Sequence, residues 1–425
     1  MQLSKLLSII AALLVSVPSF AAKPDDYAAQ ADKEWRAYIT PLLPLGERVA
    51  EVFPQAKDPQ LRQEMFRLLY SQLGAGFMQL AYANPRYPDF IPNWTQVFNN
   101  NGNINPDAVY QFTPLEDDGV YKISGFRGSV RIVDMQIGDS PVFSYGKRNA
   151  KGNFGPTLAN FDIDDFHIGQ DGAFEFILSK QRPQGYKGDW RPMPPKTNYL
   201  LVRQLAYDWL NEIDARLAID RLDLPAAKPR QSAAQIKAAL DQIPEWAERW
   251  PKMNIGFFPA TWGMDDKAEM THYEKEEGGR AAQIYIGSRF DLAPDEALIW
   301  EMAPGKCRFW NLHLGNELLN TLDFMNHQIG LNGFTARTGN DGRIRLVVSA
   351  QDPGIPNWLD TVGYKKGYLW GRLDSCENNA TPTITRVKVA DIRQHLPEDT
   401  PVVSAEERDA AIRLRRKGAQ LRRRW

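Results

Sequence analysis

The sequence predicts an α+β protein dominated by antiparallel β-sandwiches, with a helical N-terminal region and inserted helices. Apolar or alternating segments of strand length recur over two stretches, 84–225 and 255–392, and turns rather than helices connect most of them. Such connections favour antiparallel over parallel pairing. The chain of 425 residues is also longer than the chains that usually fold around one hydrophobic core, which favours two domains.

The order of these patterns predicts the organisation of the chain. Helical spacing is concentrated before the first β-rich stretch, between the two stretches, and after the second. The predicted divisions are a signal peptide (1–21), a helical N-terminal region (22–83), a first β-rich domain (84–225), a helical linker (226–254), a C-terminal β-sandwich domain (255–392) and a basic helical tail (393–425).

The N-terminus has the pattern of a secretory signal peptide. Lys5 precedes an apolar run over 6–17, and Ser19 and Ala21 place small residues at the cleavage-site positions. Cleavage would leave a mature chain beginning at Ala22, and an uncleaved anchor is the alternative. No later segment reaches the roughly 18 apolar residues of a membrane span. We therefore expect a periplasmic or secreted protein with no integral membrane segment after signal cleavage.

The overall composition is that of a globular protein and excludes one class of partner. Hydrophobic residues make up 43% of the chain and charged residues 24%. A net charge of −1 gives no reason to expect nucleic acid as the main partner. The basic tail is interpreted as a solvated helix end, with binding to an anionic surface as the alternative.

Turn and cap residues locate the helices and strands. Asp58 and Pro59 suit the start of a helix whose apolar positions repeat at helical spacing, and a further helix is expected over 198–213. Asn105-Pro106-Asp107 is typical of a turn, and a strand is expected directly after it, at Val109 and Tyr110. The main further strands are expected at 120–123, 129–137, 173–179, 282–286, 297–302, 307–314, 343–349 and 368–373.

Two of these segments point to the functional region. Strand 307–314 is expected to present Phe309, Asn311 and His313 on one face, where polar groups beside an aromatic ring resemble a pocket wall. Strand 343–349 is followed by the sharp turn of Asp352-Pro353-Gly354, and binding sites often lie on loops braced by a sheet. A turn with a purely structural role is the alternative.

The sequence assigns neither a metal nor a cofactor. It contains no GxSxG, HExxH, CxxC or P-loop pattern, and its five histidines have no ligand spacing. The cofactor therefore stays unknown, as does the oligomeric state. Cys307 and Cys376 can form a disulfide in an exported protein, or remain two buried free thiols.

The chain also resembles a known family. The residues that carry the resemblance include Asn105-Pro106-Asp107, Trp310-Asn311-Leu312 and the ten-residue segment 352–361, DPGIPNWLDT. Together they resemble a bacterial uncharacterised family with a C-terminal domain of unknown function that carries the DPGxPNWLDT signature. The resemblance implies β-sandwich or jelly-roll-like domains with helical additions. It implies no reaction and assigns no catalytic residue.

We predict a site where the turn 352–361 meets the polar side of strand 307–314. His327 is the best titratable candidate, because an imidazole suits acid–base work at neutral pH. The candidate catalytic residues are His327, Asp352 and Asp360. The candidate ligand-binding residues, chosen for hydrogen bonding or for stacking on a ring, are Asn311, Asn357, Trp358, Trp310, Asn105 and Tyr110.

Three functions remain open from the sequence. The first is an envelope enzyme that acts on a small or carbohydrate-like substrate in a β-sandwich cleft. The second is a non-catalytic protein that binds a small-molecule or sugar-like ligand through its Trp and Asn side chains. The third is a structural or assembly factor of the envelope. The 12 tryptophans and 15 tyrosines slightly favour contact with a ring or a sugar.

Overall fold

A computed structural model describes residues 24–92, 99–140, 155–261, 269–271, 283–379 and 381–422. The chain divides into two compact units, Met1–Leu43 and Pro44–Trp425. The described part of the first unit contains helix α1 (Pro24–Ile39) and a short turn of 3-10 helix, Thr40–Leu42. The predicted signal peptide lies outside the described residues.

The helices near the start of the second unit form where the sequence predicts helical structure. Helix α3 (Pro59–Gly76) follows α2 (Leu45–Ala50) and runs on into a π-helical segment, Phe77–Tyr82. Asp58 caps α3 as predicted, since its Oδ1 accepts hydrogen bonds from the backbone N–H groups of Gln60 and Leu61 at 2.8 and 3.0 Å.

Two further helices, α4 (Ala233–Leu240) and α5 (Ile243–Thr261), occupy the region predicted to link the two β-rich stretches. Helix α5 packs on α3. Gly76 permits the close approach, because a Cβ atom there would lie 3.0 Å from the Trp246 ring.

The first set of sheets is built from strands between Ile91 and Arg221. All pairs are antiparallel except β6 with β7. One sheet has the order β1 (Ile91–Pro92), β2 (Ala108–Pro114), β8 (Tyr199–Leu205), β4 (Ile132–Gly138) and β5 (Thr157–Asp162). The other has the order β7 (Asp189–Pro192), β6 (Ala173–Ser179), β3 (Tyr121–Phe126) and β9 (Arg216–Arg221).

The predicted helix over 198–213 is wrong. Its first half is strand β8, which lies between β2 and β4 and is buried along almost its whole length. A central strand covered on both faces is apolar at successive positions, so the residues at helical spacing were part of a continuous apolar run. A turn region follows the strand, so the second half of the range is not helical either.

The second set of sheets is built from strands between Glu269 and Lys388. It is antiparallel apart from the short parallel pairing of β15 with β16. One sheet has the order β10 (Glu269–Thr271), β11 (Gln283–Asp291), β17 (Lys366–Asp374), β13 (Phe309–Gly315) and β14 (Gly330–Asn332). The other has the order β16 (Trp358–Asp360), β15 (Ile344–Ser349), β12 (Glu296–Met302) and β18 (Thr383–Lys388).

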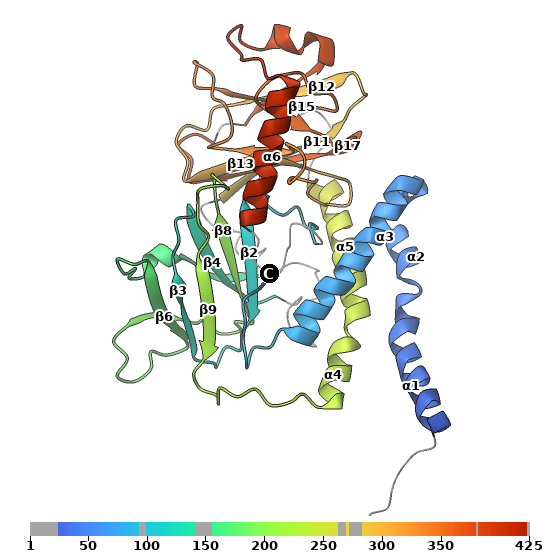
Figure 1. Cartoon of the computed structure of the whole chain (residues 1–425), viewed down its shortest axis with the longest axis vertical. Coiled ribbons are helices and arrows are strands. Elements are labelled where there is room, and N and C mark those ends of the chain that lie inside the picture. Colours follow the sequence, from blue (N-terminus) through green and yellow to red (C-terminus); the bar gives the residue numbers. More distant parts are fainter. Residues whose placement is uncertain are drawn as a thin grey trace, which may run out of the picture. The chain divides into compact units, whose positions relative to one another are not determined.

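These sheets confirm the predicted α+β fold with mainly antiparallel, sandwich-like β structure. A single large hydrophobic cluster contains residues of both sheet sets, from Phe112 and Leu201 in the first to Leu312 and Leu346 in the second. The two β-rich halves therefore share buried surface. In Figure 1, β13 lies on the side of the second set of sheets that is nearest to β2 and β8 of the first set.

The C-terminal helix α6 (Ala405–Leu421) bonds to both halves (Figure 1). Near its start, Arg408 pairs with Asp352 of the second half. Just past its end, Arg422 pairs with Asp214 of the first half. The interpretation of this tail as a solvated basic helix end is wrong for these two arginines, because their charges have internal partners.

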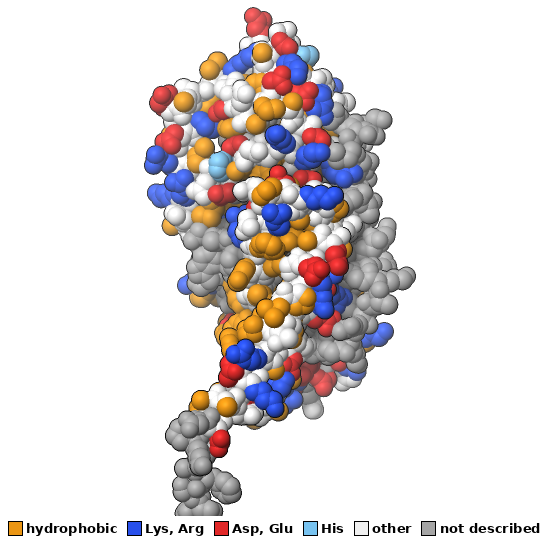
Figure 2. Space-filling model, turned by 90° about the vertical axis from the view of Figure 1, so that its right-hand side faces the viewer, with side chains coloured by type: hydrophobic (Ala, Val, Ile, Leu, Met, Phe, Trp, Pro, Cys, Tyr) orange, Lys and Arg blue, Asp and Glu red, His pale blue; other side chains and the backbone are white. Residues whose placement is uncertain are grey.

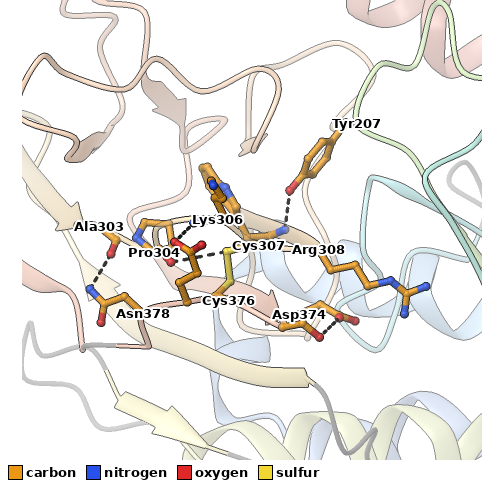
Figure 3. Close-up of a disulfide and its surroundings, with 12 residues drawn as sticks. Tyr207, Ala303, Pro304, Lys306, Cys307, Arg308, Asp374, Cys376 and Asn378 are labelled. Carbon is orange, nitrogen blue, oxygen red and sulfur yellow. Dashed lines mark hydrogen bonds between the residues drawn. A yellow bond between two sulfur atoms is a disulfide. The ribbon is translucent and has the colours of Figure 1, made fainter.

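Cys307 and Cys376 form a disulfide in the structure (Figure 3). Cys307 precedes β13 and Cys376 follows β17, and these strands are neighbours. Nearby hydrogen bonds hold the same corner. Asn378 donates to the Ala303 carbonyl at 2.8 Å, and the Glu377 carboxylate accepts from the Lys306 backbone N–H at 3.1 Å. Of the two possibilities left open by the sequence, the structure has the bonded one.

The face of the molecule shown in Figure 2 has no single dominant charge. Basic and acidic side chains are intermixed on the face shown in Figure 2. Within the ranges that the structure describes, no helix combines the length and apolar character needed to cross a bilayer.

Candidate functional site

The structure brings two of the three candidate catalytic residues into direct contact. His327 Nδ1 lies 2.6 Å from Asp360 Oδ2. The His327 side chain is 36% exposed, whereas that of Asp360 is 14% exposed. The imidazole can therefore reach solvent while its carboxylate partner is largely covered.

Backbone hydrogen bonds fix both members of this pair. The Asp360 backbone N–H donates to the Gln328 carbonyl at 2.9 Å, which ties strand β16 to the segment that carries His327. The second carboxylate oxygen of Asp360 accepts from the Val362 N–H at 2.7 Å. The His327 N–H donates to the Asp323 carbonyl at 3.1 Å. The pair is thus positioned before any ligand arrives.

The third candidate catalytic residue, Asp352, has a different role in the structure. Its carboxylate accepts hydrogen bonds from Arg408 Nε at 2.9 Å and from the Gly354 N–H at 2.9 Å. Arg408 also donates to the Ile355 carbonyl and, at 3.1 Å, to Gln328 Oε1. Asp352 and Arg408 therefore hold the turn of residues 352–361, called the signature turn below, against α6.

Asn357 is committed to the protein backbone. Its Oδ1 accepts from the Arg337 N–H at 2.8 Å, and its Nδ2 donates to the Arg337 carbonyl at 2.7 Å. Gln328 adds two bonds to the same turn, donating to the Pro356 and Trp358 carbonyls at 2.9 and 2.6 Å. The turn is held at each of these positions.

A groove of about 520 Å³ lies beside this turn. Its lining includes Pro356 and Asn357, and its cations are Arg337, Arg343 and Arg345. The last two arginines pair with Glu301. The Arg337 guanidinium is exposed and makes no hydrogen bond or ion pair with the described residues. Further lining comes from segments 338–340 and 396–401.

The two candidate tryptophans are buried. Trp358 is 6% exposed and donates from Nε1 to the Ser349 carbonyl at 3.1 Å. Trp310 is 5% exposed, and its backbone N–H donates to the Tyr207 hydroxyl at 2.9 Å. Neither side chain offers an open ring face for stacking in this structure.

Asn311, Asn105 and Tyr110 come together at the junction of the two β-rich halves. Asn311 Nδ2 donates to Asn105 Oδ1 and, at 2.8 Å, to Asp107 Oδ2. The Asn105 backbone N–H donates to the Tyr110 hydroxyl at 3.0 Å. The polar face of strand 307–314 is therefore the buried wall of this junction.

Two further buried members of the junction, Asp107 and His313, were not among the candidate ligand-binding residues, although His313 was placed on the polar face of strand 307–314. Asp107 accepts hydrogen bonds from Trp209 Nε1 at 2.9 Å and from Asn332 Nδ2 at 2.7 Å. His313 Nε2 lies 2.7 Å from Asn103 Oδ1. The turn at Asp107 was recognised, but only the register of β13 against β14 and the path of the 99–107 loop reveal these contacts.

Burial shifts the pKa values of two groups at the junction. Burial raises the pKa of the Asp107 carboxyl above its ordinary value, although hydrogen bonds from Asn332 oppose the shift. Burial also lowers the pKa of His313 well below its ordinary value, and the nearby charge of Arg372 acts in the same direction. His313 is therefore neutral at physiological pH.

The described residues contain no group of three or more His, Cys, Asp or Glu side chains placed to hold a metal. The predicted site residues fall instead into three separate sets. These are the acid–base pair (His327 and Asp360), the braced signature turn (Asp352, Asn357 and Trp358) and the buried junction (Asn105, Tyr110 and Asn311, with Trp310 nearby).

A solved structure with a similar overall architecture supports the fold. An uncharacterised protein from Burkholderia cenocepacia is 26% identical and matches with a TM-score of 0.74, covering 86% of this chain and 99% of its own. The VPA0106 protein from Vibrio parahaemolyticus is 14% identical, with a TM-score of 0.43 over 76% of this chain and 98% of its own. Neither a family model nor a curated protein sequence matches the chain.

Proposed function

We propose that the protein is an exported enzyme that transfers a proton to or from a small polar substrate. The observation that carries the proposal is the pairing of a half-exposed imidazole with a largely covered carboxylate, His327 Nδ1 to Asp360 Oδ2 at 2.6 Å. A carboxylate on Nδ1 sets the tautomer, leaving Nε2 with a lone pair that can accept a proton.

The proposed chemistry needs only these two side chains and a substrate. Nε2 of His327 takes a proton from the substrate or from a water molecule, and the imidazole becomes imidazolium. Asp360 stays ionised and stabilises that charge, as carboxylates do in histidine-dependent enzymes. Return of the proton to another atom of the substrate completes an isomerisation, and its delivery to a leaving group completes a hydrolysis or an elimination.

The arrangement favours a small polar substrate over one that needs aromatic stacking. The burial of Trp310 and Trp358 removes the support for sugar binding that those side chains gave in the sequence. The neighbouring groove of about 520 Å³ has the size of a small-molecule site. Pro356 of this groove accepts a hydrogen bond from Gln328, the residue after His327, although neither His327 nor Asp360 is among the residues that line the groove.

We also propose that the chain is an exported member of the bacterial family with the DPGxPNWLDT signature. The N-terminal sequence pattern supports export, and so does the Cys307–Cys376 bond, because disulfides persist mainly in oxidising compartments. Mass spectrometry of the protein from the periplasmic and secreted fractions checks the export. A chain beginning at Ala22 is expected, and an intact Met1 would contradict cleavage.

The acid–base proposal is tested by incubating the purified protein with a small-molecule extract of its own envelope fraction. Mass spectrometry should show compounds that the wild type converts and that His327→Ala leaves unchanged. Asp360→Asn should lower the rate by at least about tenfold through the wrong tautomer. His395→Ala, at an exposed position elsewhere, is the matched control and should act like the wild type. Equal conversion by His327→Ala and the wild type would refute the proposal.

A non-catalytic ligand-binding protein is the second candidate, and the groove favours it. Arg337 lines this groove together with Asn340 and Asn357, and its guanidinium makes no hydrogen bond or ion pair with the described residues. For a non-catalytic binding protein, Arg337→Ala should abolish the retention of small molecules from the extract. His327→Ala should retain them as the wild type does, and no compound should be converted.

A further inference from the structure

Five side chains at the junction of the β-rich halves form one connected set. Arg372 of β17 and Asn311 of β13 are register partners, so they lie side by side on the same face of the sheet. His313 is two residues further along β13 and shares that face. From the other half, Asn103 bonds His313, and Asn105 bonds Asn311.

Each member of this set has a buried polar atom without a hydrogen-bond partner among the described residues. Asn103, Asn105, Asn311 and His313 are 0–1% exposed, so these atoms have little access to solvent. Folded proteins rarely leave so many polar atoms unsatisfied in one place. The atoms are Asn103 Nδ2, Asn105 Nδ2, Arg372 Nη1, Asn311 Oδ1 and His313 Nδ1.

Most of the unsatisfied hydrogen-bonding capacity is donor capacity. Two of the atoms are amide NH₂ groups and one is a guanidinium nitrogen, each with N–H bonds to donate. The unsatisfied atom of His313 is an acceptor instead. Its Nε2–H donates to Asn103 Oδ1, so Nδ1 of the neutral ring is an acceptor. Asn311 Oδ1 is the other acceptor.

Arg372 adds a positive charge that no carboxylate of the described residues pairs with. Its Nη2 donates to the Asn103 backbone carbonyl at 2.8 Å, and its guanidinium carbon lies 5.7 and 5.9 Å from the ring centres of Tyr285 and Trp370. Across the described ranges it has no ion-pair partner. Its Nη1 is buried without a hydrogen-bond partner. A guanidinium nitrogen buried without a counter-charge is costly to the fold, and a bound anion lowers that cost.

We infer that this junction binds a small oxyanion through Arg372 Nη1 and the side-chain amides of Asn103 and Asn105. Carboxylate and phosphate groups share the needed chemistry, since both accept hydrogen bonds from guanidinium and amide N–H groups. The site goes beyond the proposed acid–base function. It uses neither His327 nor Asp360, and it lies on other strands.

The inference is tested by isothermal titration of the purified protein with sodium acetate and, separately, with inorganic phosphate. Chloride keeps the ionic strength constant. At least one of the two anions should bind to the wild type. Arg372→Gln should weaken that binding by at least about tenfold, because it removes a charge-assisted hydrogen bond. Binding of acetate alone identifies a carboxylate ligand, and binding of phosphate alone identifies a phosphate ligand.

Asn103→Asp provides a second variant that preserves the shape of the site. It places a carboxylate next to His313 within the set, so it should repel the external anion and abolish binding while the protein stays folded. Arg413→Gln removes an exposed arginine of α6 and is the charge control, which should bind like the wild type. His327→Ala should also bind normally, which separates this site from the acid–base pair.

Two outcomes would overturn the inference. One is the absence of heat with both anions in the folded wild type, which would leave water as the only partner of these atoms. The other is binding that Arg372→Gln and Asn103→Asp leave unchanged, which would locate the anion elsewhere on the protein.

Discussion

Arg422, the residue just after the end of helix α6, donates hydrogen bonds to both carboxylate oxygens of Asp214, from Nε at 3.1 Å and from Nη2 at 2.9 Å. Both side chains are buried. Arg422 also donates to the backbone carbonyls of Asp107 and Gln204, at 2.9 and 3.0 Å. One arginine thus connects the C-terminal helix to strand β8 and to the turn before β2.

Replacing this arginine should strongly destabilise the protein. Arg422→Ala leaves the Asp214 charge buried without a partner, which typically costs about 3–5 kcal/mol of unfolding free energy. Urea unfolding followed by tryptophan fluorescence measures the change. Arg413→Ala, which breaks only an exposed pair with Asp409 on the same helix, should leave the unfolding curve unchanged. Equal curves for the wild type and Arg422→Ala would show that the buried pair contributes little.

The role of this arginine illustrates what the sequence does not reveal. The sequence shows a basic tail, but Asp214 and Asp352 lie far from it along the chain, and only the folded topology brings them together. A charge pattern describes one segment of the chain without the residues that pack on it in the fold. The partner that decides whether a charge is solvated or buried depends on packing between the two halves.

The strands were predictable because alternation is a local signal. Strand β15 (Ile344–Ser349) and the turn after it follow directly from alternation and turn residues. Strand β8 was mistaken for a helix because burial on both faces removes alternation. The closeness of His327 and Asp360 was anticipated from the turn, whereas the inward direction of Trp358 depends on Ser349 and Arg408, which the sequence alone does not connect to it.

The disulfide should contribute measurably to stability. Cys307 and Cys376 are 69 residues apart, and closing a loop of that length stabilises the folded state by about 4 kcal/mol in the chain-entropy model. Reduction should therefore lower the midpoint of urea unfolding for the wild type. A Cys307→Ser, Cys376→Ser double variant should unfold earlier and should not respond to the reductant. Rapid alkylation of both cysteines in the native, unreduced protein would contradict the bond.

The signature turn should depend on Asn357. Asn357→Ala removes both bonds to the Arg337 backbone, so we expect a loss of about 1–3 kcal/mol, typical of leaving buried polar groups unsatisfied. Asn357→Asp keeps the acceptor but turns the donor into a carboxylate oxygen that faces the Arg337 carbonyl at a buried position, so it should cost at least as much as Asn357→Ala. Asn340→Ala, at an exposed position in the same groove, is the control and should change stability little. The ranking is read from urea unfolding, and equal losses for Asn357→Ala and Asn340→Ala would refute it.

Buried His313 should make stability depend on pH in a defined window. Burial holds its pKa well below the ordinary value of 6.5, and Arg372 and Arg415 add to the effect. Below pH 6.5 the unfolded chain therefore binds a proton that the folded chain does not bind. By linkage, the stability from this site is fully present above pH 6.5 and is lost as the pH falls, by up to about 1.4 kcal/mol per unit.

The prediction is isolated by comparing the wild type with His313→Gln in urea unfolding between pH 5 and 8. Other groups titrate equally in both proteins, so the difference between their unfolding free energies reports His313 alone. That difference should be constant above about pH 6.5 and should shift in favour of the variant at lower pH. His395→Gln, at an exposed position, should follow the wild type throughout. Parallel curves for His313→Gln and the wild type would mean that His313 takes up a proton in the folded protein as readily as in the unfolded chain.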